Sequence, residues 1–183
     1  MKPIVLKHII LVFVMMVFIL HIAAFSQEKT SVDIATVGIG ARPIALGGAY
    51  AGLTDDASAI FTNPAGLAHQ NRVSFVSMST QILTCVDYKV AGLSYPTDFG
   101  TFGIGYVGAS SLAGTHIYMS GGVTIEGSEM SYLNDMYVLS YGYSISDQLG
   151  LGANVKILSQ KFTGYSDAPL AGGYSTDLGA IYK

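Results

Sequence analysis

The feature that most constrains this chain is an alternation of large apolar and small residues in its second half. Over residues 137–146 the odd positions hold Tyr, Leu and Ile, whereas the even positions hold mainly Ser and Gly. The alternation recurs over residues 101–107, 149–158 and 174–182. A period of two is typical of β-strands, whose successive side chains point to opposite faces. The pattern therefore predicts strands with one bulky apolar face and one small face.

Two earlier segments, residues 72–80 and 87–96, alternate less cleanly. Val76, Met78 and Val90 occupy positions on the face that should be small. We predict strands there as well, which gives about six strands in total.

The connections between these strands alternate in length. The residues around Asp98 and Asp147 have the composition of tight turns, whereas residues 110–131 and 161–172 are long and rich in Gly and Ser. Outer-membrane barrels have short periplasmic turns and longer outer loops. We expect the two short turns to face the periplasm and the two long loops to face outward.

The scarcity of charge indicates which face meets which surroundings. Charged residues make up 11% of the chain, whereas soluble domains contain about 25%. A soluble β-sandwich or barrel turns its bulky face inward and needs a charged exterior. Asn154, Lys156 and Asp177 instead lie on the small face, which suits a wet or plugged lumen, and Tyr174 and Tyr182 could mark two aromatic girdles. We predict an all-β fold, a transmembrane antiparallel β-barrel, with a soluble secreted β-rich protein as an alternative.

The first 26 residues have the pattern of a signal peptide. Two lysines precede an apolar run over residues 9–20, and small residues stand at positions 24 and 26. The alternative is an N-terminal membrane-anchor helix, which needs about 20 apolar residues. We expect residues 1–26 to direct export through the inner membrane of a bacterial cell to the outer membrane.

Residues 27–71 lack the strand alternation, so we assign them to a small N-terminal plug, or hatch, and residues 72–183 to the barrel wall. Gly47 and Gly48 lie in a glycine-rich stretch whose backbone can follow tight paths. Asp55 or Asp56 is expected to cap a short helix over residues 57–61.

Asn63 must end that helix, because the residue before a proline is disfavoured in the α region. A rigid turn that leads toward the first strand then follows, formed by Asn63, Pro64, Ala65 and Gly66.

Residues 40–67, GARPIALGGAYAGLTDDASAIFTNPAGL, carry a resemblance to a known family. They resemble the N-terminal signature of FadL-like outer-membrane barrels, most closely the branch with PorV-like and PorQ-like proteins of type IX secretion systems. Residues 149–158 and 175–183 are also similar to that branch. The resemblance implies a 14-stranded barrel with an N-terminal hatch in its lumen. It also implies that the NPA turn, here Asn63, Pro64 and Ala65, helps to form a path for hydrophobic substrates.

Six strands are fewer than this family requires. Bacterial barrels of this kind have at least eight strands, and unpaired strand edges in hydrocarbon cost several kcal/mol per polar group. We therefore expect the sequence to be the N-terminal part of a longer protein. The alternative is that several chains pool their strands.

Sequence motifs for catalysis are missing. His69 and His116 have no metal-ligand spacing, Cys85 has no adjacent partner, and the chain contains no GxSxG. Twelve acidic against nine basic residues disfavour nucleic-acid binding. We expect neither enzyme activity, nor a cofactor, nor a metal.

The resulting hypothesis is an outer-membrane channel, in contact with membrane lipid, for hydrophobic or small solutes. The alternative is a PorV-like component that docks secreted protein cargo at the outer membrane.

Overall fold

The computed structural model describes residues 34, 38–82, 84–120, 123–163 and 169–183. The predicted signal peptide, residues 1–26, lies outside the described residues, as does most of residues 27–37. Among the described residues, no helix has both the length and the apolar character needed to cross a membrane.

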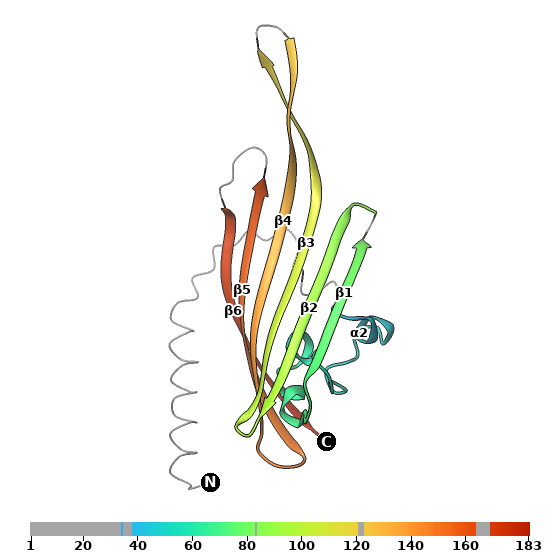
Figure 1. The fold of residues 1–183 in the computed structure, drawn as a ribbon, viewed down its shortest axis with the longest axis vertical. Helices are drawn as coiled ribbons and strands as arrows, with labels where there is room; N and C mark the ends of the chain where they lie inside the picture. Colours follow the sequence, from blue (N-terminus) through green and yellow to red (C-terminus); the bar gives the residue numbers. More distant parts are fainter. Residues whose placement is uncertain (1–33, 35–37, 83, 121–122, 164–168) are drawn as a thin grey trace.

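The described chain forms one antiparallel sheet whose strands follow one another in sequence order (Figure 1). This arrangement confirms the predicted all-β class. The sheet is open, since within the described residues the first and last strands each pair on one side only. The strands are β1 (Ser74–Ile82), β2 (Val86–Thr97), β3 (Gly100–Ser120), β4 (Val123–Ser144), β5 (Leu149–Thr163) and β6 (Pro169–Tyr182).

The prediction of two long loops was wrong. Most of residues 110–131 belongs to β3 and β4; residues 161–163 and 169–172 are the ends of β5 and β6, and residues 164–168 lie outside the described residues. Backbone hydrogen bonds pair the strands in these segments even though their side chains do not form an apolar face. Register shifts between Leu112 and Gly114 and between Thr115 and Ile117 interrupt the alternation. As a result, β3 and β4 extend well beyond their neighbours as a two-stranded ribbon (Figure 1).

Within the described residues three short helices precede the sheet, and the last two pack against one of its faces. They are α2 (Ala41–Ala45), α3 (Ala59–Thr62) and the 3₁₀-helix η2 (Pro64–His69). We call residues 38–71 the plug. Figure 1 places α3 and η2 near the sheet end that carries the β2–β3 and β4–β5 turns, and η2 contacts β3, β4, β5 and β6.

The two faces of the sheet differ as the alternation predicted. We call the face that contacts the plug the plug face and the opposite one the open face. Val138 and Ser140 on the plug face are 1% and 6% exposed, whereas Leu139 between them is 57% exposed. Bulky apolar side chains therefore point away from the plug and small ones point toward it.

The irregular positions of the first two strands also have an explanation. Val90 is buried in the cluster that contains Ile60 and Phe61 of the plug, and Val76 and Met78 pack against that cluster. Apolar residues on the plug face thus occur where the sheet contacts apolar plug side chains, which is why the alternation weakens there.

Candidate functional site

The contact between plug and sheet is a close backbone approach over glycines. A Cβ on Gly152 of β5 would lie 2.2 Å from the carbonyl carbon of Pro64, and one on Gly142 of β4 would lie 2.7 Å from the backbone nitrogen of Ala68. Real Cβ atoms do not approach this closely, so only glycine fits. Plug-contacting glycines occur on every strand from β2 to β6: Gly92, Gly103, Gly105, Gly142, Gly150, Gly152 and Gly179.

Asn63 joins the plug turn to the edge strand β6. Its Oδ1 accepts a hydrogen bond from the backbone N–H of Ala65 at 3.1 Å. Its Nδ2 donates to the carbonyls of Ala51 at 2.9 Å and Ala180 at 3.3 Å. As predicted, Asn63 ends α3 in an extended conformation, and Pro64 begins η2. Asn63, Pro64 and Ala65 are therefore brought together against β5 and β6.

A second polar connection links α3 to the sheet. The buried Asn154 of β5 donates through Nδ2 to the Ile60 carbonyl at 2.8 Å and to Asp177 Oδ2 at 3.3 Å. Lys156 Nζ lies 2.7 Å from the same Asp177 oxygen. These three side chains were predicted on the small face, but sequence reasoning gave them no role. The feature that could have revealed them is that these polar residues lie at paired or adjacent positions of neighbouring strands.

Asp55 and Asp56 do not cap a helix over residues 57–61, so that prediction was wrong. The helix begins at Ala59, and its N-cap Ser58 makes no side-chain cap bond. Asp56 instead accepts hydrogen bonds from the backbone N–H and hydroxyl of Ser58. Both carboxylates pair with Arg42, at 2.7 Å for Asp55 and 3.2 Å for Asp56. The attraction of a guanidinium distant in sequence decides their orientation.

The carboxyl of Asp56 has a lowered pKa. Its burial alone would raise the pKa, but the hydrogen bonds from Ser58 and the proximity of Arg42 stabilise the charged form more strongly. Arg42 also lies over the ring of the buried Tyr50, 5.3 Å from its centroid. Arg42 of α2 thus connects the start of the plug to Tyr50, Asp55 and Asp56.

The three plug glycines singled out from the sequence, Gly47, Gly48 and Gly66, act in two ways. Gly47 and Gly48 have positive φ angles of 61° and 84°, with open space around their Cα atoms, so they serve the backbone path. Gly66 is buried, and a Cβ there would lie 2.7 Å from the Thr54 carbonyl oxygen. Gly66 therefore allows η2 to pack against the preceding loop.

Paired residues on the open face form level rows across all six strands. The central row contains no charged residue, and in strand order it is Phe75, Leu93, Ile104, Leu139, Val155 and Thr176. The next row toward the ribbon, the boundary row, is rich in aromatic residues: Ser77, Ala91, Tyr106, Tyr137, Ile157 and Tyr174.

One step further the composition changes abruptly. The polar row holds no large apolar residue and consists of Ser79, Lys89, Gly108, Asp135, Ser159 and Gly172. The Tyr106 hydroxyl donates to Asp135 Oδ1 at 2.7 Å, so its ring lies in the apolar rows and its oxygen reaches the polar one. The apolar band of the open face therefore has a sharp upper limit.

No group of three His, Cys, Asp or Glu side chains able to hold a metal ion occurs in the described part of the chain. No protein-family model, curated protein or solved structure matches this sequence. The family resemblance of residues 40–67 therefore remains a prediction.

The glycine contact predicts a position-specific effect of one methyl group. Gly152→Ala forces the Pro64 backbone away from β5, and overpacking of this kind costs about 1–3 kcal/mol. Thermal unfolding of the purified protein, with proteolysis of the plug as a second readout, measures the loss. Gly173→Ala is the matched control, because no atom lies within 4 Å of a Cβ there. Equal effects of the two substitutions would contradict the packing described above.

The Asp56 environment predicts that acid loosens the plug. Because its pKa is lower in the folded protein, Asp56 stabilises the fold fully above its unfolded-state pKa of about 3.9. That contribution disappears as the pH falls through the lower, folded-state value. Proteolytic cleavage of the plug should therefore accelerate below about pH 4 in the native protein. Asp56→Asn should cleave faster at neutral pH and respond less to acid; an unchanged acid response would exclude this carboxylate as the cause.

Proposed function

We propose that this chain forms the plug and part of the wall of an outer-membrane β-barrel that conducts hydrophobic or small solutes. The observation that carries the proposal is the apolar band of the open face, which ends at the polar row. Its exposed members include Phe75, Ile104 and Leu139, at 68%, 56% and 57%. Water would surround these side chains in a soluble protein, whereas hydrocarbon solvates them at no cost.

The height of the band fits a membrane. Tyr182 and Tyr174 are eight residues apart on β6, which corresponds to about 26 Å along a strand. A strand tilt of about 40° reduces this to about 20 Å along the membrane normal, close to the apolar band of known barrels. The unpaired edges of β1 and β6 in the described sheet also call for further strands, because a wall in lipid must close.

The plug supports the transport part of the proposal. It covers the small face, which would be the lumen side, and polar contacts hold it there through Asn63 and Asn154. Hydrogen bonds of this kind contribute about 0.5–1.5 kcal/mol each, and they add to the apolar contacts of Ile60 and Phe61 with the sheet. We place the solute path beside the turn formed by Asn63, Pro64 and Ala65.

The ribbon favours a second candidate function, docking of exported protein cargo at the outer membrane. Beyond the polar row, the exposed side chains of Leu112, Ile117 and Met119 stand where the proposed orientation places water, at 63%, 59% and 74%. Such side chains are common at protein interfaces. Co-purification with cargo that carries a C-terminal sorting domain would favour this function over solute transport.

A charge placed in the band tests the membrane location. Leu139→Arg should reduce the amount of protein assembled in outer membranes, because Leu139 lies inside the apolar band, where Arg costs up to about 2–4 kcal/mol, the cost falling toward the interfaces. Leu133→Arg is the matched control, since Leu133 lies on the same strand and face but one step beyond Asp135 of the polar row. Membrane fractionation followed by detergent extraction measures the outcome. Release by salt alone, or equal effects of both substitutions, would favour a soluble secreted protein.

Loss of the Asn63 contacts tests the transport function. Asn63→Ala removes the bonds to Ala51, Ala65 and Ala180 and should change the uptake of a radiolabelled apolar solute, such as a long-chain fatty acid, without changing the amount of assembled protein. The neighbouring Thr62→Ala serves as the control, because its hydroxyl bonds only within the plug, to the Ser58 carbonyl. Unaltered uptake in the Asn63 variant would remove the turn from the mechanism.

A further inference from the structure

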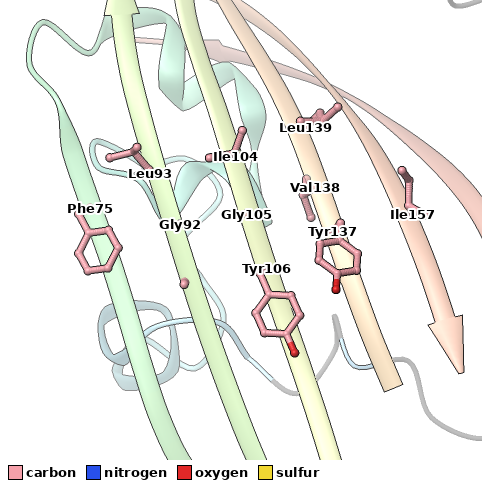
Figure 2. Close-up of a pocket in the computed structure, with 11 residues that line it drawn as sticks. Phe75, Gly92, Leu93, Ile104, Gly105, Tyr106, Tyr137, Val138, Leu139 and Ile157 are labelled. Atoms are coloured by element: carbon pink, nitrogen blue, oxygen red, sulfur yellow. The ribbon is translucent and has the colours of Figure 1, made fainter. Parts of the chain in front are cut away.

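The open face contains an apolar groove of about 360 Å³ between the central and boundary rows. Figure 2 shows Leu93, Ile104 and Leu139 along one side and Tyr106, Tyr137 and Ile157 along the other, with the plug behind the sheet. The backbones of Gly92 and Gly105 lie at its floor. The groove therefore lies within the apolar band and on the side away from the plug.

The groove exists because two tyrosine rings lean toward the polar row. The Tyr106 hydroxyl reaches Asp135 at 2.7 Å, which draws the ring away from Ile104. A Cβ on Gly108 would lie 2.2 Å from that hydroxyl, so the glycine makes room for the leaning ring. Tyr137 follows Tyr106, with ring centroids 5.3 Å apart. Hydrogen bonding at the boundary thus opens space below it.

The boundary row has a notch at its β1–β2 end. Ser77 and Ala91 stand there in register with Tyr106, and neither is large enough to continue the wall. Directly beyond Ala91 on the same strand and face is the exposed Lys89. Among the described residues the Lys89 ammonium makes no ion pair. Asp135, in the same row but two strands away, accepts the Tyr106 hydroxyl. Ala91 lines the groove, so the positive charge of Lys89 stands one step beyond the groove at the edge of the band.

We propose that this groove binds one acyl chain of a phosphate-bearing membrane lipid, whose phosphate pairs with Lys89. The proposal rests on the outer-membrane location proposed above. The groove matches such a lipid in the order of its parts. Lys89 stands at the edge of the band, where the lipid phosphate would lie, and the apolar lining lies within the band, where the acyl chain would lie. A protein partner would instead require hydrogen bonds around the contact, and the lining of the groove is apolar.

The test measures lipid bound to the purified full chain in detergent by native mass spectrometry. The probes are a phosphatidylglycerol and a diacylglycerol with the same two acyl chains. The native protein should bind the phosphatidylglycerol more tightly. Ala91→Phe fills the notch and should weaken its binding about fourfold for each methylene excluded. Lys89→Gln should weaken binding of phosphatidylglycerol about fivefold and leave diacylglycerol binding unchanged.

Two matched controls change the same residue types elsewhere on the open face. Ala180→Phe adds a ring to the band on β6, outside the groove, and Lys161→Gln removes a charge on β5 beyond the polar row. Both should bind phosphatidylglycerol as the native protein does. Circular dichroism confirms folding of each variant, and the surface substitution Lys89→Gln keeps the test informative if Ala91→Phe does not fold.

Three outcomes would overturn the proposal. Equal lipid binding by Ala91→Phe and the native protein would exclude the groove as the site. Equal loss in Lys89→Gln and Lys161→Gln would exclude a specific phosphate contact. A change of oligomeric state in Ala91→Phe, with lipid binding retained, would assign the groove to a second copy of the chain. Failure of the proposed function is distinct, because the native protein would then be absent from the detergent-extracted membrane fraction.

Discussion

The direct contact of plug backbone with strand backbone is the constraint on which the rest of this structure depends. Gly142 and Gly152 admit the turn and the 3₁₀-helix at distances that no side chain would allow. The plug can therefore lie flat on the sheet, and its few polar groups meet polar groups of the strands. Because glycine stands at each close approach, the large residues on either side of it in the strand point to the other face. The apolar open face and the glycine-lined plug face are two results of one packing requirement.

Sequence reasoning predicted the parts of the fold that depend on local pattern. Successive residues of a strand lie on opposite faces and differ in burial, as Leu139 between Val138 and Ser140 illustrates. For this reason the alternation predicted six strands and their faces. The alternation did not predict the extensions of β3 and β4. Hydrogen-bonded pairing continues there past the register shifts near Gly114, which interrupt the alternation of side chains between the two faces. Even so, the irregularity at Val90 was informative, because it marks contact with the plug.

The polar contacts of the candidate site were less accessible to sequence reasoning. Asp55 and Asp56 had the local context of helix caps, but Arg42, distant in sequence, determines where their carboxylates lie. Asn154 donates to Ile60, which is 94 residues away. Such pairings depend on how the whole sheet aligns with the plug, and no spacing rule within one segment describes them. The turn at Asn63 was predictable because proline restricts the residue before it.

The order of the elements along the chain has a consequence for how the wall assembles. The plug precedes all six strands, and it contacts strands from β2 to β6 through their glycines. A shift in the register of any of these strands by one residue would turn a bulky side chain toward the plug. The plug therefore fits the sheet only when each of these strands is in its native register.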